Sequence, residues 1–94
     1  LVKELNIKSK GMLSLQKHYH RSEHWLITQG TPLITLNKKK LSKSVNQSIY
    51  IPKGAIHRIE NPFKTNVKIL EIQKGSILKE ADIVRYQDIY GRIK

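Results

Sequence analysis

Hydrophobic and polar residues alternate with a period of two along most of this chain. Leu13 and Leu15, for example, alternate with Ser14 and Gln16. Three further runs are rich in β-prone residues, at positions 33–36, 48–51 and 67–72. Because alternate side chains of a strand share a face, these runs are predicted to be β-strands.

Turn signals separate the strand-like runs at near-regular intervals. They are Gly11, Gln29-Gly30, Asn37, Asn46, Pro52-Lys53-Gly54, Asn61-Pro62 and Lys74-Gly75. Many short strands with this spacing are typical of an antiparallel sandwich or a small barrel. The expected fold class is therefore all-β, and the 94 residues suffice for one small domain with one modest core.

One segment, from Leu78 to Tyr90, departs from the period of two. Ile83, Tyr86 and Tyr90 fall three and four positions apart, which is the spacing of one helix face. The acidic residues within positions 79–82 suit the first turn of a helix. This segment is predicted to be a short C-terminal helix.

Composition narrows the function classes. The chain has no cysteine, which excludes disulfides, Cys-type zinc sites and thiol nucleophiles. Its 18 Lys and Arg against 7 Asp and Glu give a net charge of +11, which suits an anionic ligand or simply solvated lysines. Lys38-Lys39-Lys40 follows Asn37 and is expected at a hairpin tip. No nucleic-acid motif is recognisable, so nucleic acid is not an expected partner.

The hydropathy and the first residues of the chain bear on its cellular location and on the length of the parent protein. No apolar run approaches the roughly 20 residues of a spanning helix, and no signal-peptide pattern is recognisable. We therefore expect a cytoplasmic protein with no membrane partner. The chain begins at Leu1 and enters strand-like sequence at once, which suggests a piece of a longer polypeptide.

Candidate chemistry is concentrated in two segments, 16–25 and 52–61. The first contains three of the four histidines of the chain, and the second contains His57. Imidazole nitrogens and carboxylate oxygens are common ligands of divalent metals. Strand alternation would point Gln16, His18 and His20 into one barrel mouth. Glu23 can return to the same pocket if the chain bends near Arg21-Ser22.

Several roles remain open from the residues alone. Glu23 can bind a metal or pair with Arg21 or Arg58. Gln16 can be a ligand or only a hydrogen-bond partner of one, and His20 can be a ligand or an acid/base group. Arg21 and Arg58 suit a phosphate or a polyhydroxy substrate, or else surface ion pairs. His24 is expected to be structural, and Trp25 is expected in the core.

The same segments resemble the cupin family. The second cupin motif, G-x5-P-x-G-x2-H-x3-N, is matched by Pro52, Gly54, His57 and Asn61, while Asn46 replaces its first glycine. Asn tolerates left-handed backbone, so this departure is mild. The first cupin motif is matched by Gln16, His18, Glu23 and Gly30, with four residues between His18 and Glu23 and six between Glu23 and Gly30. Gln16 stands in the place of the usual first histidine.

More specifically, the chain resembles type II mannose-6-phosphate isomerases. The segments that carry this resemblance are residues 13–25, 50–52, 57–62, 71–73 and 82–85. These isomerases are usually the C-terminal cupin domain of a bifunctional enzyme whose N-terminal part is a mannose-1-phosphate guanylyltransferase. The resemblance implies a single cupin domain over residues 1–94, a jelly-roll β-barrel, an upstream nucleotidyltransferase domain and a homodimer. The expected dimer surface is residues 5–8 or 77–90.

The implied function is interconversion of mannose 6-phosphate and fructose 6-phosphate, in the supply of precursors for polysaccharides. A divalent metal would be held by Gln16, His18, Glu23 and His57. Zinc is the first expectation, and manganese, cobalt, nickel or magnesium are alternatives. The implied catalytic groups are His20 as base and Arg21 or Arg58 for the phosphate or the developing charge.

Two other function classes stay open at this point. One is a non-catalytic cupin that binds a sugar or a nucleotide sugar. The other is a different metal-dependent cupin enzyme, such as an iron-dependent oxygenase, which would favour a facial triad with open positions. Metal analysis combined with an isomerase assay distinguishes the three.

Overall fold

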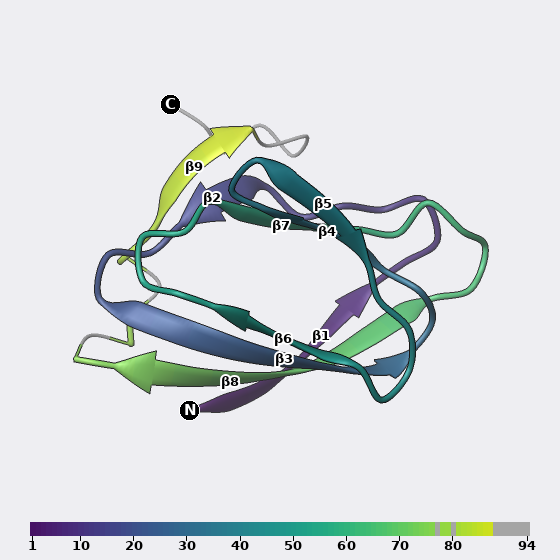
Figure 1. Ribbon diagram of the computed structural model, residues 1–94, viewed down its shortest axis with the longest axis horizontal. Helices are drawn as coiled ribbons and strands as arrows, with labels where there is room; N and C mark the ends of the chain where they lie inside the picture. The colour runs from purple at the N-terminus through teal and green to yellow at the C-terminus, as the bar shows by residue number, and fades with distance from the viewer. Residues whose placement is uncertain (77, 80, 88–94) are drawn as a thin grey trace.

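The computed structural model describes residues 1–76, 78–79 and 81–87, and this part is all β (Figure 1). Its strands are β1 (Val2–Ile7), β2 (Leu15–Lys17), β3 (Arg21–Gln29), β4 (Leu33–Leu36), β5 (Lys39–Ser42), β6 (Ser48–Ile51), β7 (His57–Glu60), β8 (Val67–Gly75) and β9 (Val84–Gln87). They form two facing sheets, with strand orders β1-β8-β3-β6 and β5-β4-β7-β2-β9.

The chain crosses between the two sheets after almost every strand. Only β4 and β5 are both consecutive and hydrogen-bonded, and all strand pairs of the described residues are antiparallel. This alternation between two sheets is the connectivity of a jelly roll. The predicted jelly-roll β-barrel is therefore confirmed, and the turn before Lys39 lies in the β4–β5 hairpin as expected.

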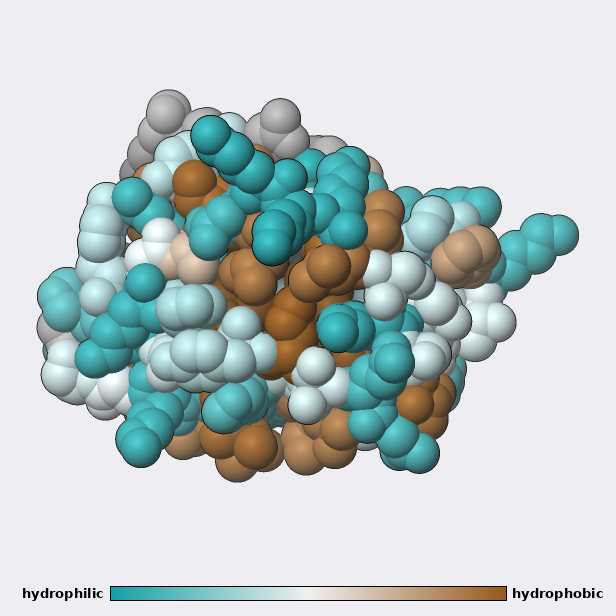
Figure 2. Space-filling model, viewed as in Figure 1, coloured by the Kyte–Doolittle hydropathy of each residue, from teal (hydrophilic) through white to brown (hydrophobic). Residues whose placement is uncertain are grey.

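The core lies between the two inner faces. Residues of the same phase in each strand point inward, such as Trp25 and Ile27 on β3 and Val67 and Ile69 on β8. Figure 2 shows hydrophobic side chains between the two sheets, with hydrophilic side chains around them. Burial of these side chains is the main stabilising contribution that the fold offers.

Left-handed backbone occurs where the cupin motif requires it. Asn46 has a φ of 72° and Gly54 a φ of 76°, so the replacement of the motif's first glycine is tolerated. The Gly54 backbone N–H donates to the carbonyl oxygen of His18 at 2.8 Å. This hydrogen bond connects the turn before β7 to the loop after β2, and it positions the two candidate ligand segments beside each other.

The predicted C-terminal helix is not observed in the described residues. Strand β9 occupies Val84–Gln87 and pairs with β2, so the prediction is wrong there. The acidic side chain of Asp82 does not begin a helix, because it accepts hydrogen bonds from the backbone N–H groups of Tyr19 (3.1 Å) and His20 (2.9 Å). The remainder of the predicted helix, at 80 and 88–90, lies outside the described residues. In the described part, no helix has the length and apolar character needed to cross a membrane.

Candidate functional site

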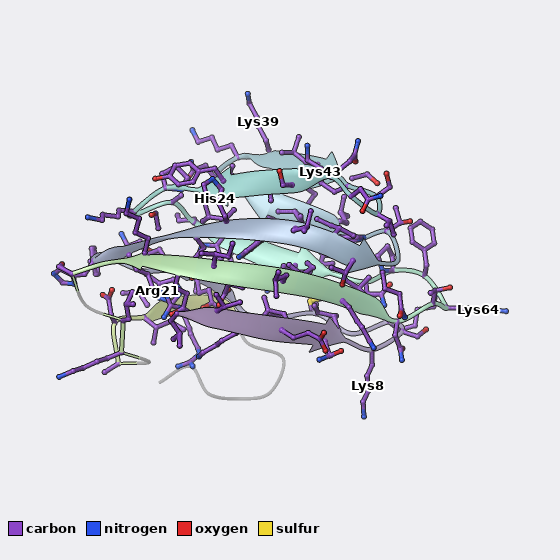
Figure 3. The ribbon with its side chains drawn as sticks, turned by 90° about the horizontal axis from the view of Figure 1, so that it is seen from below. Lys8, Arg21, His24, Lys39, Lys43 and Lys64 are labelled. Atoms are coloured by element: carbon purple, nitrogen blue, oxygen red, sulfur yellow. The ribbon has the colours of Figure 1, made fainter. Side chains whose placement is uncertain are left out.

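A cavity of about 290 Å³ lies between the two sheets, where β3 begins. This volume is near the lower end of the range for small-molecule sites. The four-stranded sheet contributes Glu23 to it and the five-stranded sheet contributes His57. Figure 3 shows Arg21 at this end of the strands and Lys64 at the opposite end.

Strand register brings the candidate ligands to this cavity. On one wall, Gln16 of β2 lies directly opposite His57 of β7. On the other wall, Glu23 of β3 lies between Gln73 of β8 and Ile51 of β6. Directly opposed residues of an antiparallel pair share a face of the sheet, so both walls present polar side chains to the same space.

His18, Glu23 and His57 form a compact buried cluster. One possible ligand atom from each lies within 4.8 Å of the other two. Nε2 of His18 is 3.4 Å from Oε2 of Glu23, and the two imidazole centroids are 5.3 Å apart. Two imidazoles and a carboxylate at this separation are a donor set for a divalent transition metal. The residues present therefore fit the metal that the sequence predicts.

Both imidazoles have one nitrogen fixed by the backbone. Nδ1 of His57 lies 3.0 Å from the carbonyl oxygen of Ala55, and Nδ1 of His18 is hydrogen-bonded to the carbonyl oxygen of Asp82. Since a carbonyl oxygen only accepts, each Nδ1 carries the proton and each Nε2 keeps its lone pair. Such hydrogen bonds orient histidine ligands in metal sites.

Burial keeps both imidazoles neutral. Desolvation lowers the pKa of His57 to about 4, although the hydrogen bond to Ala55 opposes the shift. Desolvation likewise lowers the pKa of His18, against the hydrogen bond to Asp82. Metal binding requires the deprotonated ring, so the folded protein holds both rings in the required form at neutral pH.

Arg21 lies inside the cluster as its buried cation. Its Nε donates to Oε2 of Glu23 at 2.9 Å, and its Nη2 lies 2.9 Å from Nε2 of His18. The guanidinium therefore donates a hydrogen bond to the lone pair on Nε2 of His18, and it neutralises the negative charge of Glu23. Nε2 of His18 can bind a cation only after Arg21 releases it.

Four further polar side chains line the pocket and were not predicted from the sequence: Lys3, Glu71, Gln73 and Arg85. Glu71 and Gln73 of β8 point inward beside Glu23, and Nε2 of Gln73 donates to Oε1 of Glu71 at 2.6 Å. The indole N–H of Trp25 lies 2.8 Å from Oε1 of Glu23 and 3.2 Å from Oε2 of Glu71. Burial, and then the neighbouring Glu23, raise the pKa of Glu71 to about 7. Arg85 of β9 also lines the cavity.

A signal for Glu71 and Gln73 is present in the sequence. Both residues continue the inward phase of Val67 and Ile69 along β8. A carboxylate and an amide in the apolar phase of a strand indicate a polar interior. For Arg85 no such signal existed, because its segment was predicted to be helical.

Gln16 and Arg58 line the cavity as expected. The amide nitrogen of Gln16 donates to the hydroxyl of Ser14 at 3.1 Å. Its carbonyl oxygen is therefore the atom that can take part in metal binding. Nε of Arg58 donates to the carbonyl oxygen of Leu13 at 3.0 Å, so one of its donors is held by the backbone.

His20 is not brought to the cavity. Strand β2 ends at Lys17, so the alternation that would align His20 with Gln16 does not continue. The side chain of His20 is 49% exposed, and its Nδ1 lies 3.1 Å from the carboxylate of Asp82. Trp25 is buried in the core as expected, and His24 is exposed and packs against the ring of Tyr50.

Comparison with known proteins agrees with this architecture. Residues 1–88 match the family described as the C-terminal region of mannose-6-phosphate isomerase. The chain belongs to this family. It is 47% identical to the xanthan biosynthesis protein XanB of Xanthomonas campestris, over 97% of this chain and 20% of that protein. It is 45% identical to the mannose-1-phosphate guanylyltransferase ManC of Salmonella typhimurium, over 98% of this chain and 19% of that protein.

The chain thus spans about a fifth of the length of the curated relatives that it matches. Among solved structures, it is similar to a protein from Klebsiella pneumoniae with a double-stranded β-helix domain (TM-score 0.80, 10% identity, 93% of this chain and 74% of that one). It is also similar to the cupin domain of Cnp3 from Schizosaccharomyces pombe (TM-score 0.76, 16% identity, 80% and 55%). At these identities the similarity establishes the fold, which is that of a cupin.

Proposed function

We propose that this domain is a metal-dependent aldose–ketose isomerase that interconverts mannose 6-phosphate and fructose 6-phosphate. The observation that carries the proposal is the convergence of His18, Glu23 and His57 in a buried pocket. The pocket belongs to a chain of the mannose-6-phosphate isomerase C-terminal family. Cationic side chains around the cavity, Arg21 and Arg58 among them, suit a phosphorylated sugar.

The four candidate ligands would together coordinate one divalent metal, and zinc is the first metal to test. Nε2 of His18, Nε2 of His57 and a carboxylate oxygen of Glu23 would hold the metal, and the carbonyl oxygen of Gln16 would be a fourth ligand. The metal supplies Lewis-acid polarisation of the sugar oxygens when it is bound. Trp25 holds the carboxylate of Glu23 in place through its indole N–H.

The arginines and a base complete the proposed mechanism. An isomerase of this kind moves a proton between carbons 1 and 2 of the sugar through an enediol. Arg21, which contacts Glu23 and His18, would stabilise the negative charge that develops on the substrate. His20 remains the proposed base, although it bonds to Asp82 outside the cavity lining. An unchanged kcat in His20→Gln would remove it from the mechanism.

The test combines metal analysis with a coupled assay of fructose 6-phosphate formation. Protein purified without an affinity tag is expected to carry about one divalent ion per chain and to isomerise mannose 6-phosphate. Removal of the metal with a chelator should abolish turnover, and added zinc should restore it. Metal and sugar phosphate binding without turnover would replace the isomerase by a non-catalytic sugar-binding cupin. Turnover that survives complete removal of metal would contradict the metal-dependent mechanism.

The wider setting is part of the same proposal. We infer that residues 1–94 are one cupin domain of a longer cytoplasmic chain, with a nucleotidyltransferase domain upstream. Support comes from the relatives, which are about five times as long as this chain and include a protein named as a mannose-1-phosphate guanylyltransferase. The proposed homodimer would cover the edge strand β1, which pairs only with β8 in the described part. A mass near 10.9 kDa for this domain by light scattering at micromolar concentration would exclude self-association of the domain.

A further inference from the structure

Arg85 belongs to a row of residues that crosses three strands on the inner wall of the cavity. Gln16 of β2 lies opposite His57 on one side and opposite Arg85 of β9 on the other. The register between β2 and β9 shifts next to Gln16, which re-aims side chains at this point. All three residues line the cavity. The guanidinium of Arg85 therefore faces the same space as the candidate metal ligands.

The side chain of Arg85 has an unused donor. Its Nε is buried, and it has no hydrogen-bond partner among the described residues. A buried donor without a partner is costly, and it is rare in folded proteins. Such a donor beside a cavity indicates that a bound ligand supplies the missing acceptor.

In the other two arginines of the pocket, Nε already has an acceptor. Arg21 donates to Glu23 and contacts His18, while Arg58 donates to the carbonyl oxygen of Leu13. Lys3 also lines the cavity, from β1 of the opposite sheet, and adds positive charge there. Arg85 is thus the pocket arginine whose buried Nε is left for an anion, and a guanidinium binds a phosphoryl group with two parallel hydrogen bonds.

We propose that Arg85 is the phosphate-binding residue of this pocket, and that it holds the 6-phosphoryl group of the hexose phosphate while the other end of the sugar lies at His18, Glu23 and His57. This inference rests on the proposed isomerase function. Arg85 lies two strands away from His57, and two strand spacings amount to about 10 Å. That distance is of the order of an extended six-carbon chain with a terminal phosphoryl group.

The geometry also assigns selectivity to Arg85. Mannose and mannose 6-phosphate differ only in the phosphoryl group, so loss of the guanidinium should affect the second and spare the first. Hydrogen bonds to charged groups are worth enough to change affinity by about 10- to 100-fold. Arg85→Lys keeps the charge but loses the planar pair of donors, and it should weaken binding by a smaller factor.

The experiment compares wild type, Arg85→Gln, Arg85→Lys and the control Lys64→Gln in the metal-loaded protein with its full natural chain. Lys64 is an exposed lysine at the opposite end of the barrel, so the control removes the same charge without touching the cavity (Figure 3). Calorimetric titration with mannose 6-phosphate and with mannose measures affinity, the coupled assay gives KM and kcat, and elemental analysis gives the metal content.

In Arg85→Gln we expect the affinity for mannose 6-phosphate to fall about 10- to 100-fold and KM to rise by a similar factor. Mannose affinity, metal content and the thermal midpoint should stay at wild-type values, as should every quantity in Lys64→Gln. Loss of mannose binding or of metal in parallel would indicate a structural role and overturn the assignment.

The outcomes separate this inference from the proposed function. If wild type isomerises mannose 6-phosphate and Arg85→Gln does so with the same KM, the phosphate assignment fails and the isomerase stands. If wild type binds mannose 6-phosphate through Arg85 without converting it, the isomerase fails and the phosphate assignment stands. A wild type that binds neither mannose 6-phosphate nor inorganic phosphate overturns the assignment outright.

Discussion

The two halves of the barrel interior are built on the same strands and have opposite chemistry. Along β3, the inward side chains change from Arg21 and Glu23 at the start to Ile27 further on. Along β8, Val67 and Ile69 precede Glu71 and Gln73 in the same inward phase. Because the two strands are antiparallel, their polar ends lie side by side, and so do their apolar ends.

Trp25 marks the boundary between the two halves. Its ring is buried and lies edge-on to His57, with the centroids 5.5 Å apart. Its indole N–H donates hydrogen bonds to the carboxylates of Glu23 and Glu71 in the polar half. The apolar half stabilises the fold through burial, whereas the polar half buries charges that are tolerated only when paired and hydrogen-bonded. The fold thus places its stability and its chemistry at opposite ends of the same strands.

The largest expected effect of a single change is in the polar half. His57→Ala removes one of the three clustered donors and should lower metal affinity by more than about 100-fold, since changes to mere partners of ligands already cost 10- to 100-fold. Isomerase activity should fall to background with it. His24→Ala is the matched control, because His24 is exposed on the outer face of β3. Equal metal uptake by wild type and His57→Ala, measured by elemental analysis, would contradict the proposed metal site.

Ile27→Ala tests the apolar half. Ile27 is fully buried, so its truncation should lower the free energy of unfolding by about 2–5 kcal/mol. Urea unfolding monitored by tryptophan fluorescence measures this loss. The milder Ile27→Val should cost about 0.5–1.5 kcal/mol and serves if the first variant does not fold. Both should leave metal affinity unchanged, and a tenfold loss of metal affinity in Ile27→Val would show that the halves are coupled.

The polar half was the harder one to predict from sequence. The motif spacing singled out His18, Glu23 and His57 as candidate donors, because such spacing is a local property. Their convergence depends on Gly54 meeting the backbone of His18, which is a long-range contact. Strand alternation failed for His20, because it was extended past the end of β2 at Lys17.

Strands β4, β6 and β8 were predictable for the same local reasons, whereas the C-terminal segment was predicted wrongly. The spacing of Ile83 and Tyr86 indicated a helix, but pairing with β2 overrides this local preference. Arg85 entered the pocket only through that pairing. Glu71 likewise lies beside Glu23 only because β8 pairs with β3. The order of strands in a sheet cannot be predicted from any single segment of the sequence.

Trp25→Phe probes the boundary with a smaller effect. The substitution keeps an aromatic ring but removes the donor shared by Glu23 and Glu71. Leaving two buried carboxylates without this donor should cost about 1–3 kcal/mol of stability and about tenfold in metal affinity. Denaturant titration and competition with a metal-binding dye measure the two losses. If stability falls and metal affinity does not, Trp25 supports the fold alone and does not position Glu23.

The smallest expected effect is a change in pH dependence, measured on the metal-free protein. Burial raises the pKa of Glu71 to about 7 in the folded state, above its ordinary value of 4.5. Between these values the folded state binds more protons than the unfolded state, so Glu71 lowers stability progressively as the pH rises from 4.5 to 7. His57 acts in the opposite direction, because its pKa is lowered from 6.5 to about 4 and folding then releases protons.

Glu71→Gln isolates the contribution of the carboxylate from that of the histidines. The variant keeps the shape and polar character of the side chain but cannot ionise, so its stability relative to wild type should grow from pH 5 to pH 8. The gain should reach about 1–2 kcal/mol at pH 8. Urea titrations of both proteins at the two pH values measure it. An identical pH slope in wild type and variant would mean that Glu71 ionises as freely in the fold as in the unfolded chain. The polar half would then be wetter than the apolar half, and not merely more polar.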